Sequence, residues 1–163
     1  MKILVIVKNC FYLASLLVLV SSCSASDPEI ALGNLGEDYL VFGHFYGECG
    51  GEGCIETFAL TANELYEDQN DNYFGGEYDF MLLPADKFEL VKDLVDDFPT
   101  ALLDETVDVF GCPDCGDWGG LRIEYVEDGK IRSWTLDLQI ESNPAYLRDF
   151  IETVQEKITL INN

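Results

Sequence analysis

Hydrophobic and polar residues alternate most regularly on either side of Asp128-Gly129, a dipeptide typical of the two-residue turn in a β-hairpin. Pairing outward from this turn sets Glu127 opposite Lys130 and ends with Leu121 opposite Leu136. Because successive side chains of a strand point to opposite faces, the pattern separates an apolar face from a polar one. The apolar face carries Leu121, Ile123, Trp134 and Leu136, and the polar face carries Arg122, Glu124, Ser133 and Thr135. We expect the first face in the core and the second in solvent.

Two other segments repeat their apolar residues every three or four positions, which predicts amphipathic helices. The first helix is expected over residues 84–98, with Pro99 ending it. The second is expected after Asn143-Pro144, where asparagine would cap the helix and proline would occupy its first position. The apolar stripes are Phe88, Val91, Leu94, Val95 and Phe98 in the first helix, and Leu147, Phe150, Ile151, Val154 and Ile158 in the second.

Short segments rich in aromatic and β-branched residues predict the remaining strands. They cover residues 39–46, 54–60, 78–83 and 106–110, and residues 67–77 are expected to form a polar loop. The order is hairpin, strand, helix, strand, hairpin, helix. This order predicts an α+β fold, with a small antiparallel sheet and two helices packed on one face.

The N-terminus has the parts of an export signal: Lys2 and Lys8, an apolar run over residues 11–20, and small residues at the end. The ending Val20-Ser21-Ser22-Cys23 resembles the lipobox of bacterial lipoproteins. The resemblance covers only this leader, and it implies cleavage before Cys23 and acylation of that cysteine. It also implies a cell-envelope location outside the cytoplasm, and the serine after Cys23 often accompanies the outer membrane in that class.

We therefore expect a signal peptide over residues 1–22, an acylated N-terminus and flexible tether over 23–37, and a single domain over 38–163. The alternative is an ordinary secreted protein in which Cys23 carries no lipid. Lys8 and Asn9 interrupt the apolar run, so a membrane-spanning helix is not expected.

The chain carries 31 acidic and nine basic residues, for a net charge of −22. Such a surface is a poor partner for nucleic acid, because phosphate binding needs clustered lysine and arginine. Anionic lipid headgroups would also repel it, so a membrane would have to hold it by the lipid anchor. The charge suits a basic protein or a cation as partner, or it serves solubility alone.

Four cysteines remain in the predicted domain, as Cys49-x4-Cys54 and Cys112-x2-Cys115. Export favours disulfides among them, and the sequence leaves three pairings open. The alternative is a zinc or iron site with four thiolate ligands. Residues 112–116 resemble the knuckle of zinc ribbons and rubredoxins, although the first pair has four intervening residues where those families have two.

A third reading is thiol–disulfide exchange at Cys112 and Cys115, but the glycines that follow make a poor helix start for a redox pair. His44, on the strand that enters the first cysteine loop, is a candidate extra metal ligand or a plain structural residue. Residues 68–72 superficially resemble the opening of a calcium loop, but Tyr73 stands where that loop needs glycine.

The sequence contains no serine-hydrolase elbow, no zinc-protease helix motif, no P-loop and no dinucleotide-binding glycine pattern. Its one histidine also disfavours Ser-His catalysis and sites with several histidine ligands. We therefore expect a non-catalytic binding or structural module without a cofactor. Trp118, flanked by glycines in the second cysteine loop, is the candidate contact surface, and its alternative role is to cap the core.

Overall fold

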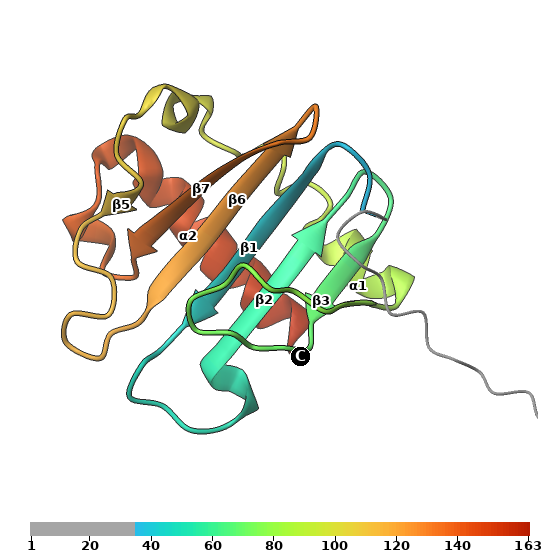
Figure 1. Ribbon diagram of the computed structural model, residues 1–163, viewed down its shortest axis with the longest axis horizontal. Helices are drawn as coiled ribbons and strands as arrows, with labels where there is room; N and C mark the ends of the chain where they lie inside the picture. The colour runs from blue at the N-terminus through green and yellow to red at the C-terminus, as the bar shows by residue number, and fades with distance from the viewer. Residues whose placement is uncertain (1–34) are drawn as a thin grey trace, which may run out of the picture.

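Seven strands form one sheet in the order β4-β3-β2-β1-β6-β7-β5 (Figure 1). All neighbours are antiparallel except β5 and β7, which are parallel. The strands are β1 (Tyr39–Phe45), β2 (Ile55–Leu60), β3 (Leu65–Asp68), β4 (Phe80–Leu82), β5 (Val109–Phe110), β6 (Gly120–Glu127) and β7 (Lys130–Asp137). The helices are α1 (Ala85–Val91) and α2 (Ala145–Ile161), with 3-10 turns η2 (Glu52–Cys54), η3 (Thr100–Asp104) and η4 (Ile140–Ser142).

This computed structural model describes residues 35–163. The predicted signal peptide, Cys23 and all but the last three residues of the predicted tether lie outside the described residues. Both helices lie behind the sheet in Figure 1, on one face of it. The predicted α+β class is therefore confirmed.

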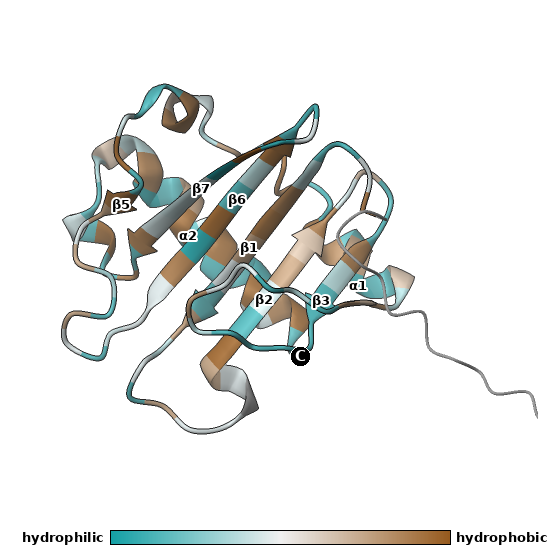
Figure 2. Cartoon of the chain, in the orientation of Figure 1, coloured by the Kyte–Doolittle hydropathy of each residue, from teal (hydrophilic) through white to brown (hydrophobic). Residues whose placement is uncertain are grey.

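The β6–β7 hairpin has the predicted register, from Glu127 opposite Lys130 to Leu121 opposite Leu136. Asp128 and Gly129 adopt φ angles of 51° and 70°, the positive values that this tight turn requires. Hydrophobic and hydrophilic bands alternate along β6 in Figure 2. The turn and the alternation thus fix the same register independently.

The main core lies between the sheet and the helices. Most of its large side chains are completely enclosed, and each contributes about 1.5–3 kcal/mol by leaving water. Strands supply Leu40, Phe42, Phe58, Leu60, Leu65, Phe110, Leu121, Ile123, Trp134 and Leu136. The helices and their connections supply Val91, Leu94, Phe98, Leu102, Leu147, Phe150, Ile151, Val154, Ile158 and Ile161. The apolar face predicted for the hairpin is therefore the core face.

The opposite face of the sheet has a smaller core of its own. It consists of Leu35, Val41, Ala59, Tyr66 and Phe80, with Tyr39 and Tyr78 packed against it. The loop between β3 and β4, residues 69–79, crosses this face in front of the sheet in Figure 1. The expectation that Arg122 and Glu124 face solvent is wrong, because both are partly buried against this loop.

The first helix is shorter than predicted. It ends at Val91, and the chain continues to Phe98 in tight turns such as the bond from the Leu94 amide to the Val91 carbonyl (2.9 Å). Leu94 and Phe98 of the predicted apolar stripe are buried in these turns, whereas Val95 is 41% exposed. Acids at 93, 96 and 97 lie where the negative end of a longer helix dipole would be, which disfavours a regular helix there.

The second helix begins at Ala145, but Asn143 is not its cap. The side chain of Asn143 is buried and donates instead to the carbonyls of Asp137 (2.8 Å) and Gln139 (3.1 Å). It thus closes the turn that joins β7 to α2.

The sequence missed β3, because its four residues do not alternate between apolar and polar. Leu65 and Tyr66 are both buried, one in each core, and β3 pairs with both β2 and β4. The predicted strand over residues 106–110 shrinks to Val109–Phe110, where the chain touches the edge of β7. Leu35, within the predicted tether, is 5% exposed and already packs in the smaller core.

Candidate functional site

The only histidine of the chain lies directly opposite a carboxylate. His44 on β1 pairs across the ladder with Glu56 on β2, and both side chains point to the helix face of the sheet. Opposed side chains on antiparallel strands lie within contact distance, so the register itself creates this pair. His44 Nε2 is 3.3 Å from Glu56 Oε2, and the two side chains are 15% and 14% exposed. The pair is therefore largely shielded from water.

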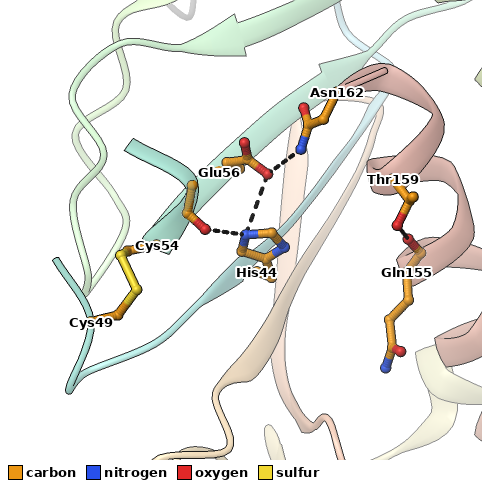
Figure 3. A network of polar contacts seen from close by, with 8 residues as sticks. His44, Cys49, Cys54, Glu56, Gln155, Thr159 and Asn162 are labelled. Atoms are coloured by element: carbon orange, nitrogen blue, oxygen red, sulfur yellow. Dashed lines mark hydrogen bonds and ion pairs between the residues drawn. A yellow bond between two sulfur atoms is a disulfide. The ribbon is translucent and has the colours of Figure 1, made fainter. Parts of the chain in front are cut away.

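Two groups contact the His44 ring nitrogen Nε2 in Figure 3. Nε2 is 3.1 Å from the Gly53 carbonyl as well as 3.3 Å from Glu56 Oε2. The same Glu56 oxygen accepts a hydrogen bond from Asn162 Nδ2 at the end of α2 (2.5 Å). Because a carbonyl and a carboxylate can only accept, the hydrogen of a neutral imidazole resides on Nε2. The other nitrogen, Nδ1, is then an acceptor, and it faces α2 (Figure 3).

Nδ1 faces a pocket of about 200 Å³ between β1 and α2, which we call the His44 pocket. Besides His44, its walls are formed by Tyr46, Leu138, Gln155, Ile158, Thr159 and Asn162. Partial burial and the field of Glu56 raise the pKa of the Tyr46 hydroxyl, so this group is a neutral donor at physiological pH. The pocket thus combines hydrogen-bonding groups with aliphatic and aromatic walls.

The four cysteines of the domain form two local disulfides. Cys49 pairs with Cys54 and Cys112 with Cys115, with Cα–Cα distances of 5.6 and 5.5 Å. The first closes the loop that places the Gly53 carbonyl on His44 (Figure 3). The second lies in the loop after β5, and no helix begins there, unlike the arrangement of thioredoxin-type pairs.

Both cysteine loops meet at the carboxylate of Asp114. Its Oδ2 accepts the Gly47 amide (2.8 Å) and the Tyr73 hydroxyl (2.8 Å), and its Oδ1 accepts the Gly119 amide (2.9 Å). Burial alone would raise the pKa of Asp114, but these three hydrogen bonds outweigh it and hold the pKa below its ordinary value of 3.8. Asp114 therefore joins the first cysteine loop, residues 69–79 and the second cysteine loop.

Two large aromatic side chains project from these joined loops. Trp118 is 58% exposed, so it does not cap the core. Phe74 is 85% exposed and rests edge-on against Tyr73 (5.1 Å between ring centroids). We call these two side chains, with the Tyr73–Asp114 hydrogen bond that links their loops, the aromatic loop surface. The sequence singled out Trp118 but gave no signal for Phe74.

The calcium-like residues hold their own loop instead of converging on one point. Asp68 Oδ1 accepts the amides of Asn70 (3.3 Å) and Asp79 (2.6 Å), and the Asn70 side chain donates to the Glu77 carbonyl. Within residues 35–163, no group of three or more histidine, cysteine, aspartate or glutamate side chains is arranged to hold a metal ion. His44 in particular does not join the cysteine sulfurs in such a group.

The sequence analysis singled out His44 and the cysteines, but it did not identify Glu56, Asn162 or Asp114 as site residues. Glu56 could have been found by pairing residues 39–46 with residues 54–60, since both strands were predicted. Asn162 and Asp114 give no such signal, because their contacts join segments 106 and 67 residues apart.

Comparison with family models finds no match, and comparison with curated proteins finds no similar sequence. Neither helix within residues 35–163 is long and apolar enough to cross a bilayer.

Proposed function

We propose that the protein is a lipid-anchored lipoprotein of the cell envelope whose folded domain is a non-catalytic binding module. The observation that carries this proposal is the distribution of cysteines. The four in the domain form disulfides, which suits an oxidising compartment, and Cys23 stands at the end of an export leader. Cleavage there would make Cys23 the acylated first residue.

Two variants and a mass measurement test the anchor. Cys23→Ser is expected to release the protein from membranes, and Cys10→Ser, within the predicted signal peptide, is the matched control. Mass spectrometry of the native protein should find a lipid-modified N-terminus at Cys23. An intact N-terminus at Met1, or a Cys23→Ser protein that stays on membranes, would refute the anchor.

The aromatic loop surface is the proposed contact face, and a partner with basic residues suits it best. Exposed aromatic rings attract lysine and arginine side chains, and the net charge of −22 would favour a basic partner at longer range. A photo-crosslinking residue in place of Phe74 or Trp118 should trap the same partner in cells. The matched control is Ile131 on β7, which is as exposed as Trp118 at 58%. Equal trapping from all three positions would argue against this face.

A further inference from the structure

Three of the polar groups that line the His44 pocket have no hydrogen-bond partner within residues 35–163. Among the described residues, no hydrogen bond is formed by Nδ1 of His44, the hydroxyl of Tyr46 or the side-chain amide of Gln155. Half-buried groups of this kind are satisfied by water or by a ligand. Together they offer an acceptor, a hydroxyl, and an amide that both donates and accepts.

The charges around the pocket select against ions. No lysine, arginine, aspartate or glutamate is among its lining residues, so an anion would find no opposite charge there. The carboxylate of Glu56 adjoins His44 and is already bonded to His44 and Asn162. A cation would therefore have to compete with these bonds, whereas a neutral hydroxylated molecule requires no charge.

The walls also suit the apolar side of a small ring. Tyr46 offers an aromatic ring and Leu138 an aliphatic group, and Ile158 also lines the pocket although it is almost fully buried. At about 200 Å³ the pocket is smaller than the roughly 300–1,000 Å³ typical of sites for drug-sized ligands. One ring with several hydroxyl groups fits this volume.

From these observations we infer that the His44 pocket binds a neutral monosaccharide, with a ligand hydroxyl donating to His44 Nδ1. The Tyr46 ring packs against the C–H face of the sugar, and Gln155 bonds a second hydroxyl. The first disulfide and Asn162 are positioning elements: the disulfide-closed loop and Glu56 together hold the imidazole with Nδ1 toward the pocket. This site shares no lining residue with the aromatic loop surface, and it does not depend on the lipid anchor.

The single histidine makes the test direct. Full-length protein labelled with ¹⁵N only in histidine gives just two ring signals, and free protein should show hydrogen on Nε2. Titration with methyl β-D-glucopyranoside should shift Nδ1 in a saturable way and leave Nε2 protonated. Sodium glucuronate and choline chloride are the anionic and cationic probes, and both should bind at least about tenfold more weakly.

Variants then locate the binding. Gln155→Ala is expected to weaken binding of the glucoside about fivefold to tenfold, and His44→Phe by at least as much. Gln139→Ala, at an exposed site in the same part of the chain, is the control and should bind as the wild type does. Gln155→Ala leaves the His44–Glu56 pair in place, so it reports on the pocket even if His44→Phe folds poorly. Absence of saturable shifts, preference for choline or glucuronate, or unchanged affinity in Gln155→Ala would each overturn the inference.

Discussion

The side chain of Asp114 connects three loops that are far apart in the sequence. One carboxylate accepts hydrogen bonds from two cysteine loops and from Tyr73 in the loop over the sheet. It does so at a φ of 58°, a conformation that aspartate and asparagine tolerate better than most residues. Replacement by asparagine therefore removes the charge and one acceptor without adding backbone strain.

Asp114→Asn should lower the free energy of unfolding by about 1–3 kcal/mol near neutral pH, since hydrogen bonds to a charged acceptor are lost. The matched control is Asp117→Asn, in the same loop and also at positive φ (60°), where the structure shows no side-chain hydrogen bond. Urea denaturation of the three proteins measures the difference. Equal stability of the two variants would contradict the role of Asp114.

The difference in stability between the wild type and Asp114→Asn should change with pH in a defined direction. The folded state holds the pKa of Asp114 below 3.8, so its contribution is complete above the unfolded-state value and is lost as the pH falls through the folded-state value. The stability gap between wild type and Asp114→Asn should therefore be constant from about pH 7 to 5 and shrink below about pH 4. A gap that stays constant down to about pH 2 would be inconsistent with this assignment.

At the scale of elements, the β6–β7 hairpin could be predicted from the sequence down to its register. Its turn residues and its alternation are local signals, and both appear in consecutive residues. Residues 67–77 were predicted as a polar loop, but the position of this loop across the sheet could not be predicted, because a side chain from another element holds it there. Arg122 on β6 donates to the Tyr73 (2.7 Å) and Asn72 (3.4 Å) carbonyls and lies over the Phe45 ring.

Arg122→Gln should release the 69–79 loop from the sheet, because the Asn72 and Tyr73 carbonyls of the loop lose a charged hydrogen-bond donor. Hydrogen exchange of amides 69–79 is expected to become about tenfold faster, corresponding to about 1.4 kcal/mol. The matched control is Arg132→Gln on β7. Arg132 also donates to two carbonyls, of Leu103 and Glu105 (both 2.9 Å), and lies over the Trp134 ring.

In the control, faster exchange is expected in residues 100–105 and not in 69–79. If both variants accelerated both segments equally, the effect would be global unfolding and the local role of Arg122 would be disproved.

The disulfides also act at the element scale, since each closes only a short loop. The chain-entropy model assigns such loops about 2 kcal/mol each, less than the roughly 4 kcal/mol of a bridge between the two loops. The double substitution Cys112→Ser with Cys115→Ser should cost about 2 kcal/mol. The same change at Cys49 and Cys54 should cost more, because Cys54 is buried and its loop supports His44.

Peptide mapping of unreduced protein should find Cys49 linked to Cys54 and Cys112 to Cys115, with no free thiol in the domain. Recovery of four thiols with one bound zinc or iron would replace this pairing with the thiolate site. A peptide linking the two loops would refute the local pairing alone.

At the scale of the whole molecule, the charge balance is the dominant feature. The chain has 31 acids against nine basic residues, and only four ion pairs join described residues, one of them at His44. Carboxylates on the surface therefore mostly repel one another. Composition predicted this property, but it could not place the His44 pocket, which exists only because α2 returns to cover β1.

Salt should stabilise the domain, because it screens this repulsion. Raising NaCl to about 0.5 M shortens the screening length to a few ångströms and should raise Tm at neutral pH. Near pH 4 many carboxylates are protonated, so the same salt should have a smaller effect. Calorimetry at both pH values makes the comparison, and a salt-independent Tm at neutral pH would show that the repulsion is unimportant.

The two outermost strands of the sheet, β4 and β5, have only three and two residues. A neighbouring molecule that tried to add a strand beside β4 would gain very few backbone hydrogen bonds, although Met81 and Leu82 there are 42% and 43% exposed. At the other margin β5 covers only Thr135 and Leu136 of β7, so the first half of β7 is the edge at which another strand could pair. In the proposed membrane-anchored form, where copies would be confined to one surface, this half of β7 is the part of the sheet where we expect unwanted pairing between copies to begin.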